Sequence, residues 1–285
     1  MHRKSQRNVH DSIACKLLVA FICMSVNTFA VPASASSHTA AASETGQTIS
    51  SVPEFAVATV KLSAPDMQGQ GISMKEGRFA ATNFTVKDLI AFAYGIHASQ
   101  LQNLPKWANV IKFDIQGVPD SETRLDLSSY KLMLQKLLAT RWNLRFHTKL
   151  DEIPVFELTA LKTEKKLQKS DPMTPGPGLL NMRLIEAGME IVGRNANIDE
   201  FASTLQSAVF DKPVVNSTGL VGRFDFNIVF TPDERVFGGA PIPHRESWDA
   251  PSFFTAIAQV GLKITSTRKQ INTIVVDSVE QPSPN

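Results

Sequence analysis

Cysteine is scarce in this 285-residue chain, and none of it lies where we expect a fold. The two cysteines, Cys15 and Cys23, both fall within the first 35 residues, which have the pattern of a targeting segment. The remaining chain therefore offers no disulfide, no thiolate nucleophile and no cysteine ligand for a metal. Its stability has to come from buried apolar side chains, for which a chain of about 250 residues is long enough.

Motifs for metal, phosphate or nucleophilic chemistry are missing as well. No two of the later histidines, His38, His97, His147 and His244, have the HExxH spacing of a metal site. No GxSxG or SxxK pattern marks a serine nucleophile, and no glycine-rich stretch has the context of a phosphate-binding loop. We therefore predict no catalytic, cofactor-binding or metal-binding residues, although a Ser-His-Asp triad assembled from distant segments remains an open alternative.

Residues 1–35 resemble a signal peptide. A basic start with Arg3, Lys4 and Arg7 precedes the largely apolar Ile13–Ala30, and Ala33-Ser34-Ala35 has the small side chains that signal peptidase accepts. We predict cleavage near Ala35, no membrane span afterwards and a secreted or periplasmic location. Removal of this segment changes the formal net charge from +2 to −1. A nucleic-acid partner is therefore not expected.

Two parts of the sequence correspond to each other. Asn83–Leu89 resembles Asn195–Phe201, and Phe113-Asp114-Ile115 resembles Phe224-Asp225-Phe226. The paired marks are 30 residues apart in the first copy and 29 in the second. A shared spacing of this length is typical of an internal repeat. We expect Leu89 to superpose on Phe201, and Phe113 on Phe224.

The hydrophobic patterns predict an α+β fold of two tandem related ββαβαββ units, each a small mixed sheet with helices on one face. Each unit is expected to close with a hairpin, the first turning at Asp151-Glu152. The predicted boundaries are a signal peptide at 1–35, a disordered leader at 36–52, a first unit at 53–161, a Pro/Lys-rich linker at 162–178, a second unit at 179–280 and a tail at 281–285. Residues 231–251 are expected to form a long surface loop.

Asp114 and Asp225 occupy equivalent places in the repeat, which raises the possibility of a catalytic carboxylate pair. Each stands between two apolar residues of a predicted strand. Its side chain should therefore point away from the core, toward solvent or a turn amide. We favour this structural role.

Several motifs together resemble a known family. They are Pro53–Ala58, Gly77-Arg78-Phe79, Ala93-Tyr94-Gly95, Asp151–Phe156, Thr218–Phe226 and Glu280–Ser283. In this combination the chain resembles the secreted "soil-associated" family of uncharacterised acidobacterial proteins. Each half also resembles the short N-terminal domain of secretins and TonB-dependent receptors, a small module that makes protein contacts in the periplasm. The first resemblance implies no catalytic residues, and the second implies a binding role.

We therefore expect an exported, non-enzymatic module that binds a protein or peptide of the cell envelope. An extracytoplasmic hydrolase acting on envelope or extracellular polymers is the alternative. The candidate binding residues are Trp107, Trp248, Tyr94 and His97. Open strand edges are expected at Val110–Val118 and Pro213–Asn216, and a partner strand is predicted to add beside an exposed Trp107. Alternatively, Trp107 folds inward and covers the first core.

Overall fold

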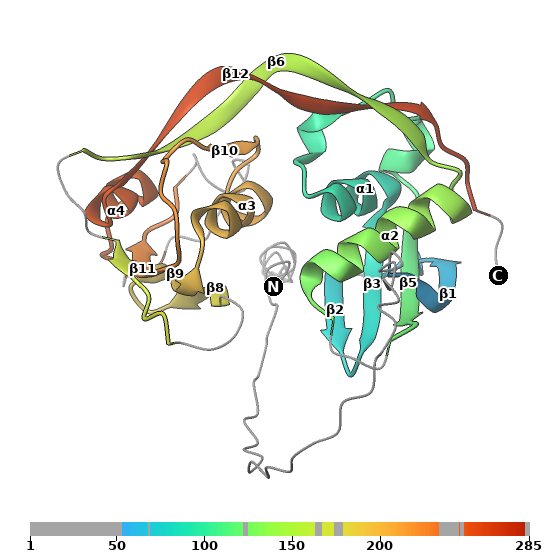
Figure 1. The fold of residues 1–285 in the computed structure, drawn as a ribbon, viewed down its shortest axis with the longest axis horizontal. Coiled ribbons are helices and arrows are strands. Elements are labelled where there is room, and N and C mark those ends of the chain that lie inside the picture. Colours follow the sequence, from blue (N-terminus) through green and yellow to red (C-terminus); the bar gives the residue numbers. More distant parts are fainter. Residues whose placement is uncertain are drawn as a thin grey trace, which may run out of the picture.

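The protein is a mixed α+β structure with three small sheets (Figure 1). The computed structural model describes residues 53–67, 69–121, 125–162, 167–173, 179–233, 245 and 248–282. The signal peptide, the leader and most of the long loop predicted from the sequence lie outside these residues. No helix in the described part of the chain is long and apolar enough to span a membrane.

The first unit is an antiparallel sheet with the strand order β1-β5-β3-β2, covered on one face by two helices (Figure 1). A short strand, β4, and two short 3-10 helices connect the first helix to β5. The elements are β1 (Phe55–Leu62), β2 (Gly71–Lys75), β3 (Arg78–Thr85), α1 (Val86–Tyr94), η2 (Ala98–Gln100), β4 (Leu101–Gln102), η3 (Lys106–Asn109), β5 (Lys112–Pro119) and α2 (Leu127–Arg141).

The second unit repeats this order of elements around a sheet with the order β7-β11-β9-β8, which is also antiparallel. Its short strand β10 follows its first helix, as β4 follows α1. The elements are β7 (Gln168–Lys169), β8 (Leu179–Ile185), β9 (Gly188–Ala196), α3 (Ile198–Ala208), β10 (Val214–Asn216), β11 (Phe224–Phe230) and α4 (Phe253–Gln259).

Two long strands connect the units as a ribbon (Figure 1). β6 (Arg145–Ala160) and β12 (Leu262–Ser278) pair antiparallel along nearly their whole length, from Leu262 opposite Ala160 to Ser278 opposite Arg145. At about 3.3 Å per residue, such a strand is roughly 50 Å long. β10 adds to β6 and β4 adds to β12, both in parallel, so this third sheet is the mixed one.

The ribbon corrects two predictions. The closing hairpins are wrong, because the chain runs straight through Asp151-Glu152, and β6 finds its hydrogen-bonding partner in β12 of the other unit. The mixed sheet in each unit is also wrong, because each unit's own sheet is antiparallel. Asp151-Glu152 contains no glycine or Asn-Gly pair of the kind that favours a tight hairpin, so the local sequence does not enforce a turn at this point.

Each half of the chain contributes ribbon residues to both hydrophobic cores. The first core lies between α1, α2 and the first sheet, and Ile274 and Val276 of β12 pack into it. The second core lies between α3, α4 and the second sheet, and Phe156 and Leu158 of β6 pack into it. The ribbon is therefore a shared structural element rather than a tether.

Part of the expected linker is folded. Gln168–Lys169 forms β7 beside Phe224 and Asp225 of β11, and Leu167 packs against the second core. Residues 163–166 and 174–178 of the expected linker lie outside the described chain. Backbone pairing with β11 thus overrides the polar, proline-punctuated composition that indicated a loop.

The local helix signals mostly give the correct starting points. Thr85 with Asp88, and Asn197 with Glu200, have the sequence pattern of a helix start, and they form capping boxes at the starts of α1 and α3. The second helix starts two or three residues earlier than a cap at Ser128 or Ser129 would place it. Its N-cap is Asp126, whose side chain accepts the Ser129 N–H. A carboxylate is a good N-cap acceptor, and the neighbouring serines donate their hydroxyls to it.

Core truncations test this packing. Leu137 of α2 and Leu205 of α3 are buried in the first and second cores. We expect Leu137→Ala and Leu205→Ala each to lower the free energy of unfolding by about 2–5 kcal/mol in urea titrations. Leu132→Ala, on the exposed side of α2 at 43% exposure, should change it by less than about 0.5 kcal/mol. Wild-type stability of either core variant would contradict the assignment.

Candidate functional site

The C-terminal end of α1 lies at the side of the first unit that contacts the second. Gly95 ends the helix in the left-handed conformation, with φ of 65°. The Gly95 N–H donates to the Phe92 carbonyl and the Ile96 N–H to the Ala91 carbonyl, which closes the helix as a Schellman motif. This abrupt end leaves Tyr94 and Gly95 beside α2 rather than in the core.

A hollow of about 280 Å³ opens between α1 and α2 at this point. Its walls combine apolar and polar side chains and include Tyr94, a predicted binding residue. The lining residues are Ala93, Tyr94, Gly95, Ser128, Lys131, Leu132 and Gln135. The edge of the Tyr94 ring packs against Phe146 of β6, with centroids 4.9 Å apart, so the ribbon fixes this wall of the hollow.

Lys131 supplies the positive charge of the hollow. Its ammonium nitrogen lies 5.6 Å from the centre of the Phe92 ring. Burial lowers the pKa of Lys131, and no neighbouring carboxylate acts against that shift. Among the described residues, neither the hydrogen bonds nor the ion pairs give Lys131 an acidic partner. Lys136, Lys149 and Lys269, in contrast, each pair with a carboxylate.

The second unit contacts the rim of the hollow through Gln206 of α3. The Gln206 amide nitrogen lies 3.5 Å from the Gly95 carbonyl oxygen, at the limit of a hydrogen bond. The side-chain oxygen of Gln206 accepts the Val214 N–H, at the start of β10. One side chain thus links the rim of the hollow to the edge of the ribbon sheet.

His97 lies just beyond this rim and is tied to the ribbon. The ring Nδ1 of His97 accepts the backbone N–H of Ser99 at 3.1 Å. The backbone N–H of His97 donates to the side-chain oxygen of Gln100. Gln100 in turn donates to the Asn272 carbonyl of β12. Burial lowers the pKa of His97. The negative charge of Asp211 raises this pKa by a smaller amount, and the positive charge of Lys87 lowers it further.

The two predicted tryptophans lie elsewhere. Trp107 is in η3, half-buried against the first core. Trp248, the other candidate binding residue, is buried, with 8% of its surface exposed. The hydrogen bonds near Trp248 join its loop to Arg245 and to Ala187 in the second unit. The structure therefore brings together Tyr94 and His97, but not these two.

The predicted strand edges are only partly correct. β10 is an edge of the ribbon sheet, as expected, but β5 is paired on both sides, with β1 and β3. Strand addition at β5 beside Trp107 is therefore excluded. The first N–H of β10 is also occupied, by Gln206. An edge this short and partly capped offers little template for a partner strand.

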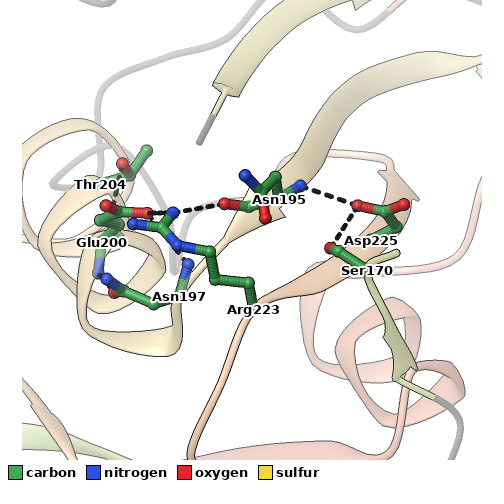
Figure 2. Close-up of polar contacts among 7 residues, drawn as sticks. All are labelled: Ser170, Asn195, Asn197, Glu200, Thr204, Arg223 and Asp225. Atoms are coloured by element: carbon green, nitrogen blue, oxygen red, sulfur yellow. Dashed lines mark hydrogen bonds and ion pairs between the residues drawn. The ribbon is translucent and has the colours of Figure 1, made fainter. Parts of the chain in front are cut away.

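Asp114 and Asp225 have matching structural roles. Each accepts a serine hydroxyl and the backbone N–H of an asparagine with positive φ, at a bulge that precedes the first helix of its unit. The partners are Ser63 and Asn83 for Asp114, and Ser170 and Asn195 for Asp225, at 2.6–2.8 Å. Figure 2 shows the second cluster, in which Arg223 also lies between the Asn195 carbonyl and Glu200.

These bonds identify the aspartates as supports of the bulges. The Asn195 N–H and the Ser170 hydroxyl lower the pKa of Asp225, which keeps this carboxyl group ionised. The turn-amide role expected from the sequence is thus confirmed. Among the described residues, no group of three or more His, Cys, Asp or Glu side chains could hold a metal ion.

Sequence reasoning missed Lys131 and Gln206. One signal was available for the first. Ser128, Lys131, Leu132 and Gln135 follow the spacing i, i+3, i+4, i+7, a second stripe on α2 beside its apolar one. Gln206 carried no such signal, because its contact depends on how the two units meet.

The protonation of His97 gives a pH-dependent prediction. The folded state holds the His97 pKa below its ordinary 6.5, so the unfolded chain binds the proton at higher pH. The stability contributed by a neutral His97 should be complete above pH 6.5 and fall as the pH drops below it.

We expect His97→Asn, which keeps a side-chain acceptor for the Ser99 N–H, to lose less stability than wild type between pH 7.5 and 5.5 in urea unfolding. His147→Asn removes an exposed histidine of β6 for comparison. An unchanged pH dependence in the His97 variant would contradict the prediction.

Comparison with known proteins gives a family without an assigned activity. The family model described as "Protein of unknown function (DUF3738)" matches residues 87–279, from the start of α1 to the end of β12. No curated protein and no solved structure matches the chain. The match covers more than half of the chain: the second unit, the ribbon and the first unit from α1 onward, while β1, β2 and β3 precede it. The chain therefore belongs to this family of proteins of unknown function.

Proposed function

We propose that the protein is an exported, non-enzymatic module that binds a protein or peptide partner of the cell envelope, in the hollow between α1 and α2. The single observation that carries this proposal is the hollow itself. It is a shallow, open depression whose walls carry aromatic, aliphatic, hydroxyl, amide and cationic groups, a combination that also occurs in ligand sites.

The size of the hollow favours a short part of a chain over a complete cofactor. Pockets for small molecules usually measure about 300–1,000 Å³, and this one, at about 280 Å³, falls just below that range. A peptide would place one side chain in it and continue across the rim. The rim carries Gly95 and, from the second unit, Gln206. A bound chain would thus meet both units.

The carboxylates support a binding role more than acid catalysis. A general acid usually needs a raised pKa. In this protein, hydrogen bonds from Asn195 and Ser170 lower the pKa of Asp225. Bonds from Lys149, Thr273 and Gln102 lower that of Asp151. Both groups are engaged in holding backbone or strands in place.

The expected location agrees with a partner outside the cytoplasm. Residues 1–35 have the basic, apolar and small-residue pattern of a signal peptide. An exported binding module would meet proteins of the envelope or the extracellular medium. The proposal therefore commits to a polypeptide partner from that compartment.

A peptide array tests the proposal directly. Each random peptide is attached once through its N-terminus and once through its C-terminus, and is probed with the full chain. We expect a set of peptides to bind. Leu132→Trp, which fills the hollow from its rim, should weaken their binding at least tenfold.

Leu150→Trp is the matched control, because Leu150 is an exposed leucine of β6 outside the hollow. Its binding should equal that of wild type. Absence of peptide binding in both formats would contradict the proposed function, as would equal losses in the two tryptophan variants.

A further inference from the structure

We propose that the hollow recognises a carboxylate, namely the C-terminal carboxylate of a peptide whose last side chain is apolar, and that Lys131 binds it. This inference rests on the proposed function and names the chemistry of its ligand. It rests on three features: an ammonium group that has no acidic partner among the described residues, a lining suited to one negative charge, and apolar walls beside that charge.

Among the residues that the structure describes, no carboxylate pairs with the ammonium group of Lys131 in the hollow. A half-buried cation loses hydration, and a carboxylate within hydrogen-bond distance restores that loss. Within the described residues, its recorded contact is with the face of the Phe92 ring. A ring face offers a cation only a weak attraction compared with a desolvated carboxylate.

The end of α1 does not use this cation as a cap. Its last carbonyls already accept other donors, namely Ile96 N–H at Ala91, Gly95 N–H at Phe92 and the Gln135 amide at Ala93. Lys131 lies close to this end, since a Cβ atom on Gly95 would be 3.4 Å from its Nζ. Glycine thus leaves room for the ammonium group beside the hollow while the carbonyls are satisfied without it.

The charge of the site suits a carboxylate better than a phosphate. Lys131 is the single cationic residue of the lining, and no arginine is there to form a two-pronged contact. The C-terminus of α1 adds partial negative charge nearby, which opposes any anion and opposes a dianion more strongly than a monoanion. A group with one negative charge matches this balance.

The neighbouring side chains suit the last residue of a peptide. Ala93, Tyr94 and Leu132 give an apolar wall for its side chain. Gln135 uses its amide nitrogen on the Ala93 carbonyl, which leaves its oxygen as an acceptor for the peptide N–H. Carboxylate, N–H and side chain would each then have a partner of the appropriate kind.

The test compares N-acetyl-leucine with N-acetyl-leucinamide, in which a neutral carboxamide of similar size replaces the carboxylate. Binding to the full chain is followed by NMR, through the amide signals of Gly95 and Leu132 and the side-chain nitrogen of Lys131. We expect N-acetyl-leucine to bind at least tenfold more tightly than the amide. It should also raise the pKa of Lys131, because an adjacent anion favours the charged form.

Variants separate charge from folding. Lys131→Met should lose at least tenfold in affinity for N-acetyl-leucine, and Lys131→Arg should retain most of it. Lys136→Met removes another lysine of the same helix, one that pairs with Glu54 outside the hollow, and should bind as wild type does.

The inference is overturned if acid and amide bind equally, if neither binds, or if Lys131→Met binds like wild type. Should peptides still bind on the array in any of these cases, the proposed function stands and only the carboxylate assignment fails. Loss of peptide binding in both array formats would instead remove the proposed function.

Discussion

The antiparallel ladder between β6 and β12 is the interaction on which the rest of the structure depends. Each of these strands has one end in the first core and the other in the second, with Val276 and Leu262 at the two ends of β12. An isolated two-stranded ribbon has little stability in water. This ribbon is held because its ends are packed in two cores and its edges pair with β4 and β10. The two units are consequently parts of one fold.

The ladder also determines where the candidate site lies. Gln100 links the segment after α1 to the Asn272 carbonyl of β12, and Phe146 of β6 packs against Tyr94. From the other side, Gln206 connects β10 to the Gly95 carbonyl. The hollow between α1 and α2 therefore has the ribbon packed against one wall and the second unit in contact with its rim. Binding there would be sensitive to the relative positions of the units, which is a useful property in a module that responds to a partner.

Local features of the fold were predictable from the sequence, whereas features that depend on distant partners were not. The capping boxes at Thr85 and Asn197 and the turn-amide role of Asp225 follow from neighbouring residues, and the structure confirms them. The strand character of β6 was also visible in the sequence. A strand has the same sequence pattern whether it pairs within a local hairpin or with a distant strand, so the pattern did not identify β12 as the partner. The same reason explains the error at β5, whose second neighbour, β1, lies some fifty residues earlier in the chain.

Of the candidate site, Tyr94 and His97 were named from the sequence. Lys131 was not, because a lysine on a helix surface is usually solvated, and its burial appears only when α1 packs beside it.

An engineered cross-link across the ribbon tests the central claim most directly. The Phe156 N–H donates to Pro213 of β10, so Phe156 and every second residue before it, including Leu150, belong to the pairs of the β6–β12 ladder that do not exchange hydrogen bonds. In such pairs the Cα atoms are about 4.5 Å apart, within reach of a disulfide. Leu150 faces Asn272 in this register. The account predicts that the double variant Leu150→Cys/Asn272→Cys forms an intramolecular disulfide under mild oxidation, identified by peptide mass mapping. Free thiols, or disulfides formed only between molecules, would contradict the pairing of β6 with β12 and with it the shared ribbon.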